Sequence, residues 1–221
     1  MAFAMIRPES RPFIDAARTD DARLADVDRA VAALRADFER WSRWGLGLLG
    51  FLAAVVGIFF GVGTIETARM LGVPPDLIDL TAIAIAAIIG LGGIALLLAL
   101  WWSGHRIIAA ASWWTRLPYT RGGRQRRAGG WIAARAVNFE PRVLARIISG
   151  TLSFLVAVSG IALFFRDLSE QITSMTAVFG CVGLLALLAM AGQIGGVLRL
   201  VSGLGEADPL WVRVRSAFLR R

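Results

Sequence analysis

The chain has 221 residues, of which 57% are hydrophobic and 18% charged, and its mean hydropathy is +0.64. A water-soluble surface does not tolerate this much apolar area, so the composition excludes an ordinary soluble globular protein and predicts an integral membrane protein. All 24 basic residues are arginines, and the formal net charge is +8. The net charge could suggest nucleic acid, but the arginines lie between apolar stretches, where they act first as topology determinants.

In the N-terminal region, residues 1–43, the first residues from Met1 to Asp28 contain no apolar stretch of signal-peptide length, so we expect no cleaved leader. Its second half has apolar residues spaced three and four apart, which predicts a heptad seam on a helix with Thr19 or Asp20 as N-cap. Two interpretations stay open: a docking helix for a partner, or an amphipathic helix lying on its own chain or on headgroups, which the mixed charge of the other face favours. The seam consists of Leu24, Val27, Val31, Leu34, Phe38 and Trp41.

Four uncharged apolar stretches are each long enough for the ~20 residues that cross a ~30 Å hydrocarbon layer. Lipid offers no partner for exposed amides, so each stretch is predicted to be a helix. The predicted spans are Trp44–Ile65, Leu80–Trp102, Ile147–Phe165 and Met175–Leu198. They form two hairpins, 44–102 and 147–198, so the predicted fold class is an all-α integral membrane protein with additional cytoplasmic amphipathic helices.

The segment between the hairpins, residues 103–146, is predicted to be an arginine-rich loop with interfacial helices. It lacks the Gly-Lys-Ser/Thr ending of a P-loop; we interpret it as a contact for anionic lipid, at ~1 kcal/mol per Arg near the surface, or for a partner protein. The alternative is a plain positive-inside loop, and RNA binding is disfavoured. The predicted contacts are Trp113, Trp114, Arg121, Arg124, Arg126, Arg127 and Trp131.

The C-terminal tail, residues 199–221, is predicted to contain a basic amphipathic helix in the headgroup layer. Asp208 and Pro209 suit its N-cap and first position. Its predicted contacts are Trp211, Arg213 and Arg215.

The arginines also predict the orientation. Eight precede the first span, nine lie between Arg106 and Arg146 and five follow from Arg199, whereas the two short loops hold only Arg69 and Arg166. The positive-inside rule therefore places both termini in the cytoplasm, and the composition suggests a bacterial inner membrane. All eight tryptophans lie near the predicted cytoplasmic boundary, as in an interfacial aromatic belt.

An internal repeat relates the two hairpins. At an offset of 103, nine of the sixteen positions from Arg43 to Ile58 recur. The residues Arg43, Gly47, Leu49, Phe51, Leu52, Ala54, Val55, Gly57 and Ile58 recur as Arg146, Gly150, Leu152, Phe154, Leu155, Ala157, Val158, Gly160 and Ile161. Apolar alphabets inflate chance identity, but the pattern favours a duplication that makes parallel repeats, which occur in some transporters and also in plain structural bundles.

Small residues in the spans predict close helix packing, either within the bundle or between subunits. The predicted packing residues are Gly57, Gly61, Gly90, Gly92, Gly93, Gly192 and Gly196. Polar groups inside the spans are few, and Ser153, Ser159 and Gln193 are candidates for lining a pore. Coupled transport is disfavoured because no ionisable group lies within a span.

No catalytic, metal or cofactor site is predicted. His105 is the only histidine, and Asp76 and Asp79 are interpreted as loop residues that place charge at a helix N-terminus. Our leading hypothesis is a non-enzymatic inner-membrane subunit or scaffold that packs with other membrane subunits or with itself. The alternative is a small pseudo-symmetric channel or facilitator acting as an oligomer, and no motif supports a third option, a membrane enzyme acting on lipid or quinone.

Overall fold

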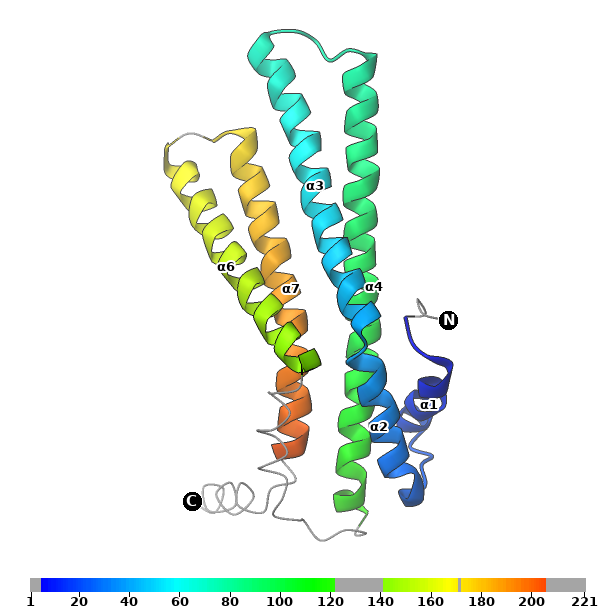
Figure 1. The fold of residues 1–221 in the computed structure, drawn as a ribbon. Helices are drawn as coiled ribbons and strands as arrows, with labels where there is room; N and C mark the ends of the chain where they lie inside the picture. The colour runs from blue at the N-terminus through cyan, green and yellow to red at the C-terminus, as the bar shows by residue number, and fades with distance from the viewer. Residues whose placement is uncertain (1–4, 122–140, 171, 206–221) are drawn as a thin grey trace. The chain divides into compact units, whose positions relative to one another are not determined.

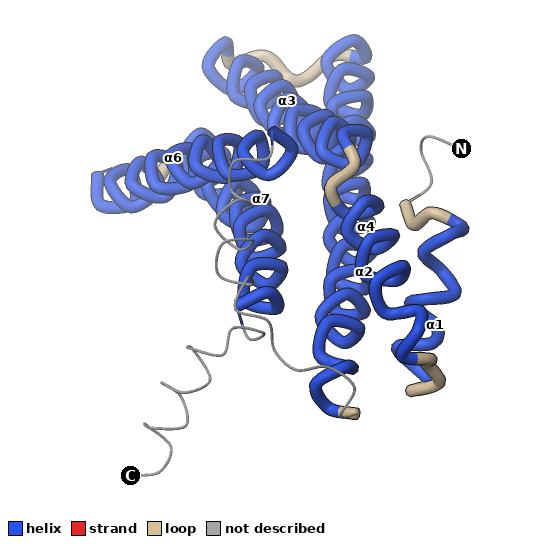
Figure 2. Tube along the Cα trace, turned by 60° about the horizontal axis from the view of Figure 1, so that its bottom comes forward, coloured by secondary structure: helices blue, strands red, loops and turns tan. Residues whose placement is uncertain are grey.

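The computed structural model describes residues 5–121, 141–170 and 172–205, and within these ranges the regular structure is helical. The long helices are α1 (Arg11–Thr19), α2 (Val27–Phe38), α3 (Trp41–Leu71), α4 (Leu77–Thr120), α6 (Pro141–Glu170) and α7 (Ser174–Gly205), joined as Figure 1 shows. Short 3-10 turns, Pro8–Ser10 and Leu24–Asp26, precede α1 and α2. Among the described residues the loops are short connections between helices (Figure 2).

The chain divides into two compact units. One comprises residues 1–43, 101–147 and 193–221 and is called the α1–α2 unit; the other comprises residues 44–100 and 148–192 and is called the hairpin unit. Close glycine contacts pair α3 with α4 and α6 with α7 in the hairpin unit, and the two predicted hairpins supply its residues.

Four helical stretches are long and apolar enough to cross a membrane, which makes the chain a multi-pass membrane protein. They are Leu24–Leu71, Leu77–Pro118, Val143–Glu170 and Ser174–Gly195. The prediction of four helices long and apolar enough to span a membrane is confirmed, and α3, α4, α6 and α7 are each longer than the span predicted in them. Pro141 begins α6, in keeping with the preference of proline for the first helical turn.

Helix α4 departs most from its prediction. Its 44 residues rise about 66 Å, about twice the hydrocarbon thickness, and the helix runs through Trp102 to Thr120 where separate interfacial helices were expected. The continuation has its own apolar face, because Ile107, Ala111 and Trp114 all lie in a core within the α1–α2 unit. Hydropathy marks where the lipid-facing stretch ends, and it does not mark where the helix ends.

Backbone-to-backbone contacts at glycine hold the hairpins. A Cβ at Gly57 would collide with the backbone of Gly90, and a Cβ at Gly160 would lie 2.9 Å from the Cα of Gly183. Small residues permit such approaches where lipid supplies no hydrophobic drive for association. Gly93 is equally tight against α3, at Ala54.

The other predicted packing glycines fare differently. Gly61 makes only an ordinary contact, 3.7 Å from the Cβ of Ala86, and a Cβ at Gly92 would have no described atom within 4 Å. Gly92 lies on an exposed face of α4, so it makes no close packing contact within the described part of the chain, and packing between subunits stays a prediction for it. Gly192 and Gly196 lie in α7.

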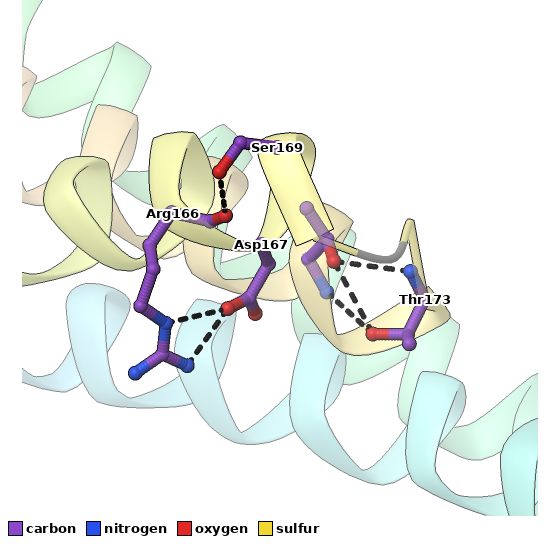
Figure 3. Close-up of polar contacts among 5 residues, drawn as sticks. Arg166, Asp167, Ser169 and Thr173 are labelled. Atoms are coloured by element: carbon purple, nitrogen blue, oxygen red, sulfur yellow. Dashed lines mark hydrogen bonds and ion pairs between the residues drawn. The ribbon is translucent and has the colours of Figure 1, made fainter.

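Reciprocal side-chain caps begin α4 and α7. Asp79 N–H donates to Asp76 Oδ1 over 2.8 Å, and Asp76 N–H donates to Asp79 Oδ2 over 3.3 Å. Thr173 and Thr176 exchange the same pair of bonds, 3.1 and 3.3 Å long (Figure 3). These caps satisfy amides that have no partner inside the helix. Asp76 and Asp79 thus hold the helix N-terminus, as predicted.

Two hydrogen bonds inside the hairpin unit join the hairpins. The indole N–H of Trp44 donates to Ser149 Oγ over 3.1 Å, and Arg69 Nη1 donates to Ser174 Oγ over 3.1 Å. The arginine also lies 3.9 Å from the carboxylate of Glu66. The first bond occupies one tryptophan of the predicted belt.

The α1–α2 unit has a conventional apolar core. Trp114 is 1% exposed, its indole N–H donates to the Phe13 carbonyl over 2.8 Å, and the two rings meet edge to face with centroids 5.9 Å apart. The core consists of Ile14, Val27, Ala30, Leu34, Phe38, Ile107, Ile108, Ala110, Ala111, Trp114 and Leu117. Burial of this apolar surface is what stabilises the unit.

The start of α2 differs from its prediction. Asp20 has φ 56° and ends α1 in the left-handed conformation, which an aspartate adopts more readily than most residues. Thr19 donates its hydroxyl to the Asp15 carbonyl over 3.1 Å. Neither residue caps α2, which begins at Val27 after a 3-10 turn, with Asp26 as N-cap.

Candidate functional site

Six buried polar residues gather in the α1–α2 unit, and we call them the ionic cluster. Their exposed fractions are 0% for Asp37, 6% for Glu39, 9% for Arg40, 5% for Arg43, 6% for Ser103 and 6% for Arg146. Buried charges are costly unless they are paired and hydrogen-bonded. The hydrogen bonds and ion pairs of this cluster therefore decide whether its buried charges stabilise the unit.

The carboxylates are held by backbone and arginine donors. Asp37 Oδ2 accepts the N–H of Arg7 over 2.8 Å, and Asp37 Oδ1 lies 3.8 Å from Arg40 Nη1. Glu39 Oε1 accepts from Arg35 Nε over 2.7 Å, one helical turn back. Asp37 thus ties the N-terminal segment before α1 to the last turn of α2.

Arg43 connects three parts of the unit. Its Nη2 donates to Ser103 Oγ on α4 over 2.7 Å, and its Nη1 donates to the Met5 carbonyl over 2.9 Å. The neighbouring Gly104 makes room for the guanidinium, because a Cβ there would lie 3.0 Å from Arg43 Nη2. Ser103 and Gly104 together form the seat for Arg43 on α4.

Arg146, near the start of α6, holds the end of α2. Its Nη2 donates to the Phe38 carbonyl over 2.6 Å, and its Cζ lies 4.4 Å from the centroid of the Phe38 ring. The last carbonyls of a helix lack partners inside the helix and carry negative partial charge. A guanidinium over an aromatic face adds a cation–π attraction, so Arg146 both caps the end of α2 and packs on the Phe38 ring.

The arginines of the ionic cluster experience both attraction and repulsion from neighbouring charges. Arg43 is attracted by Asp37 and repelled by Arg40 and Arg146, while Arg146 is attracted by Glu39. A guanidinium stays protonated in proteins and has no acceptor, so these arginines suit hydrogen bonding and charge pairing. Removing one partner of a buried pair costs ~3–5 kcal/mol. The bonds of the cluster can therefore hold α2, α3, α4 and α6 in one relative arrangement.

The predicted seam is divided between core and surface. Val27, Leu34 and Phe38 are buried in the core with residues of α4, Val31 packs against that core, and Leu24 and Trp41 are 43% and 47% exposed. Most of the seam therefore faces the protein's own helices.

The predicted lipid and partner contacts are spread over several environments. Trp114 is a core residue, so the structure does not offer it to lipid; Trp113 is half-buried beside it. Arg121 is exposed and binds the end of α1, with Nη2 3.0 Å from Asp20 Oδ1 and Nη1 2.9 Å from the Ala22 carbonyl. Outside the described residues lie Arg124, Arg126, Arg127, Trp131, Trp211, Arg213 and Arg215.

The candidate pore residues are not gathered by any described contact between them. Ser159 is exposed on α6, while Ser153 on α6 and Gln193 on α7 are half-buried. Gln193 also belongs to the α1–α2 unit, whereas both serines belong to the hairpin unit.

Sequence reasoning did not select the ionic cluster as a site. A signal was present, because the repeat aligns Arg43 with Arg146, and both arginines prove to be buried donors. Outside these positions, Phe38-Glu39 recurs as Phe139-Glu140 and Ser103-Gly104 recurs as Ser202-Gly203. A charged residue that recurs beside an apolar span is therefore a candidate for a buried hydrogen bond as well as a topology determinant.

In the described part of the chain, no three His, Cys, Asp or Glu side chains gather where they could hold a metal ion. No family model, curated protein or solved structure matches the chain.

Proposed function

We propose that this protein is a non-enzymatic subunit or scaffold of a membrane complex, in which four spans carry a rigid helical unit that contacts a cytoplasmic partner or anionic lipid. The observation that carries the proposal is the ionic cluster. It joins the N-terminal segment, α2, α3, α4 and α6 by short charge-assisted hydrogen bonds. Such bonds fix helices in one arrangement, which is what a docking platform requires.

The proposed location is a bacterial inner membrane with both termini in the cytoplasm. The distribution of 22 arginines on one side against Arg69 and Arg166 on the other supports this orientation. Trp101 and Trp102, at the predicted end of the second span, are 57% and 67% exposed. Exposed tryptophans at that depth fit an interfacial belt.

We also propose that the hairpins are parallel repeats. The tight pairs Gly57–Gly90 and Gly160–Gly183 support this, because Gly57 and Gly160 are equivalent in the repeat. The reciprocal caps at Asp76–Asp79 and Thr173–Thr176 support it further, since each begins the second helix of its hairpin. Duplicated hairpins would present two related surfaces to partner subunits.

The test is mass spectrometry of the proteins that co-purify when native membranes are extracted in mild detergent. We expect stoichiometric partners with the wild-type chain and with Arg29→Gln, whose side chain is 80% exposed. Arg146→Gln should lose those partners because α2 is no longer held at its end. A lone homo-oligomer whose liposome flux is abolished by Gln193→Leu would overturn the scaffold in favour of a channel.

A further inference from the structure

The α3–α4 hairpin carries an open groove beside its turn, with a volume of about 570 Å³. This volume lies in the range of sites for small molecules. Aromatic and aliphatic side chains dominate its lining, including Phe59, Phe60, Leu71 and Val73. All the lining residues belong to the hairpin unit.

The floor of the groove is open and offers few donors. A Cβ at Gly63 would meet no described atom within 4 Å, so the absence of a side chain there leaves space. The hydroxyls of Thr64 and Thr67 donate to the carbonyls of Phe60 and Gly63 on their own helix, over 2.8 and 2.9 Å. With both hydroxyl protons used, the threonines add no donor to the groove.

Among the described residues that line the groove, Asp79 is the only charged one. Its Oδ2 accepts a single long bond of 3.3 Å from Asp76 N–H, and a carboxylate has room for about four donors. The chain from Glu66 to Asp79 holds three carboxylates and one guanidinium. This end of the groove therefore attracts a cationic donor and repels an anion.

The depth of the groove indicates what would fill it. The predicted span boundaries at Ile65 and Leu80 would place Phe59 and Phe60 in the hydrocarbon layer and Asp79 near the headgroups. An occupant must have an apolar chain at one end and a cationic hydrogen-bond donor at the other. Lipid at this depth is the most abundant molecule with that pattern.

We propose that this groove binds one alkyl chain of a phospholipid with a primary ammonium headgroup, of the ethanolamine class, whose ammonium donates to Asp79. The site goes beyond the proposed scaffold role and does not require a protein partner. A choline headgroup carries the same positive charge but has no N–H to donate, so the site distinguishes the two headgroups by hydrogen bonding.

The experiment is native mass spectrometry of the full chain, delipidated in detergent and titrated with ethanolamine or choline phospholipids of identical chains. We expect the wild type to retain one ethanolamine lipid with about tenfold preference over choline, the size of one charge-assisted hydrogen bond. Gly63→Leu should fill the groove and lose binding of both lipids. Gly92→Leu is the matched control, because it places the same side chain on an exposed face of α4 and should bind as the wild type does.

A second variant separates headgroup from chain. Asp79→Asn keeps a capping side chain, so it should fold and bind both lipids equally, while Asp76→Asn, outside the lining, should keep the preference. The proposal is overturned by a wild type that binds both headgroups equally, by retention of the lipid in Gly63→Leu, or by a chain dimer that Gly63→Leu dissociates. None of these outcomes alters the co-purification result that tests the scaffold role.

Discussion

The two units of this protein differ in which apolar side chains they bury. In the α1–α2 unit large apolar side chains such as Leu34 and Ile107 are fully buried, and charged groups join them inside. In the hairpin unit Ile88 and Leu91 are 72% and 67% exposed, and the buried positions include Ala54, Ala157 and Ala186. Where lipid solvates large apolar side chains, they gain little by turning inward and small residues pack at the helix contacts, whereas water drives large apolar side chains into a core.

The largest effect is expected where a buried charge loses a partner inside the α1–α2 unit. Asp37→Ala removes the partner of the Arg7 amide and of Arg40, and it should lower the free energy of unfolding by ~3–5 kcal/mol. Denaturant unfolding of the detergent-solubilised protein measures it. Asp21→Ala, at an exposed position, is the control, and equal losses in both variants would show that the cluster does not stabilise the unit.

The seam offers the next largest difference. Leu34→Ala should cost ~2–5 kcal/mol, because Leu34 is fully buried and its removal leaves a cavity. Leu24→Ala, at a 43% exposed position in the same seam, should change the unfolding free energy by less than ~1 kcal/mol. The same unfolding assay compares them, and a large loss at Leu24 would indicate that the seam docks against another surface.

In the hairpin unit the decisive substitution adds one methyl group. Gly57→Ala should cost ~1–3 kcal/mol, because the new Cβ forces α3 away from Gly90. Gly92→Ala should be neutral or slightly stabilising, since the methyl meets no described atom and alanine favours a helix. Unfolding in detergent by increasing sodium dodecyl sulfate measures both, and equal effects would mean that the hairpin does not close at Gly57.

The smallest effect is expected at Arg121. Its bond to Asp20 is exposed, with side-chain exposures of 36% and 73%, so Arg121→Gln should cost only ~0.2–1 kcal/mol. The loss should shrink at high salt because surface charges are screened. Comparing the unfolding midpoint at low and high ionic strength checks this, and a salt-independent loss would assign the stabilisation to the carbonyl bonds instead.

The sequence predicts features that depend on neighbouring residues better than features that depend on contacts with distant helices. The caps at Asp76 and Asp79 were interpretable because N-terminal charge and a turn are read within a few residues. The length of α4 was not, because the face that contains Ile107 and Trp114 looks like an interfacial helix until α1 and α2 are seen to cover it. Gly92 and Gly93 illustrate the same limit, since adjacent glycines look alike but only Gly93 faces α3.

By itself the sequence determined the number of spans and their approximate places. Hydropathy over ~20 residues is a local property, and it decides whether a helix can cross the hydrocarbon layer. The arginine distribution and the repeat likewise depend only on order along the chain. Which residues meet was decided by tertiary structure alone: Arg43 with Ser103 and Gly57 with Gly90 are separated by 60 and 33 positions. Such pairs depend on the rotation of each helix and on where the helices cross, and small changes in either select different partners for the same side chains.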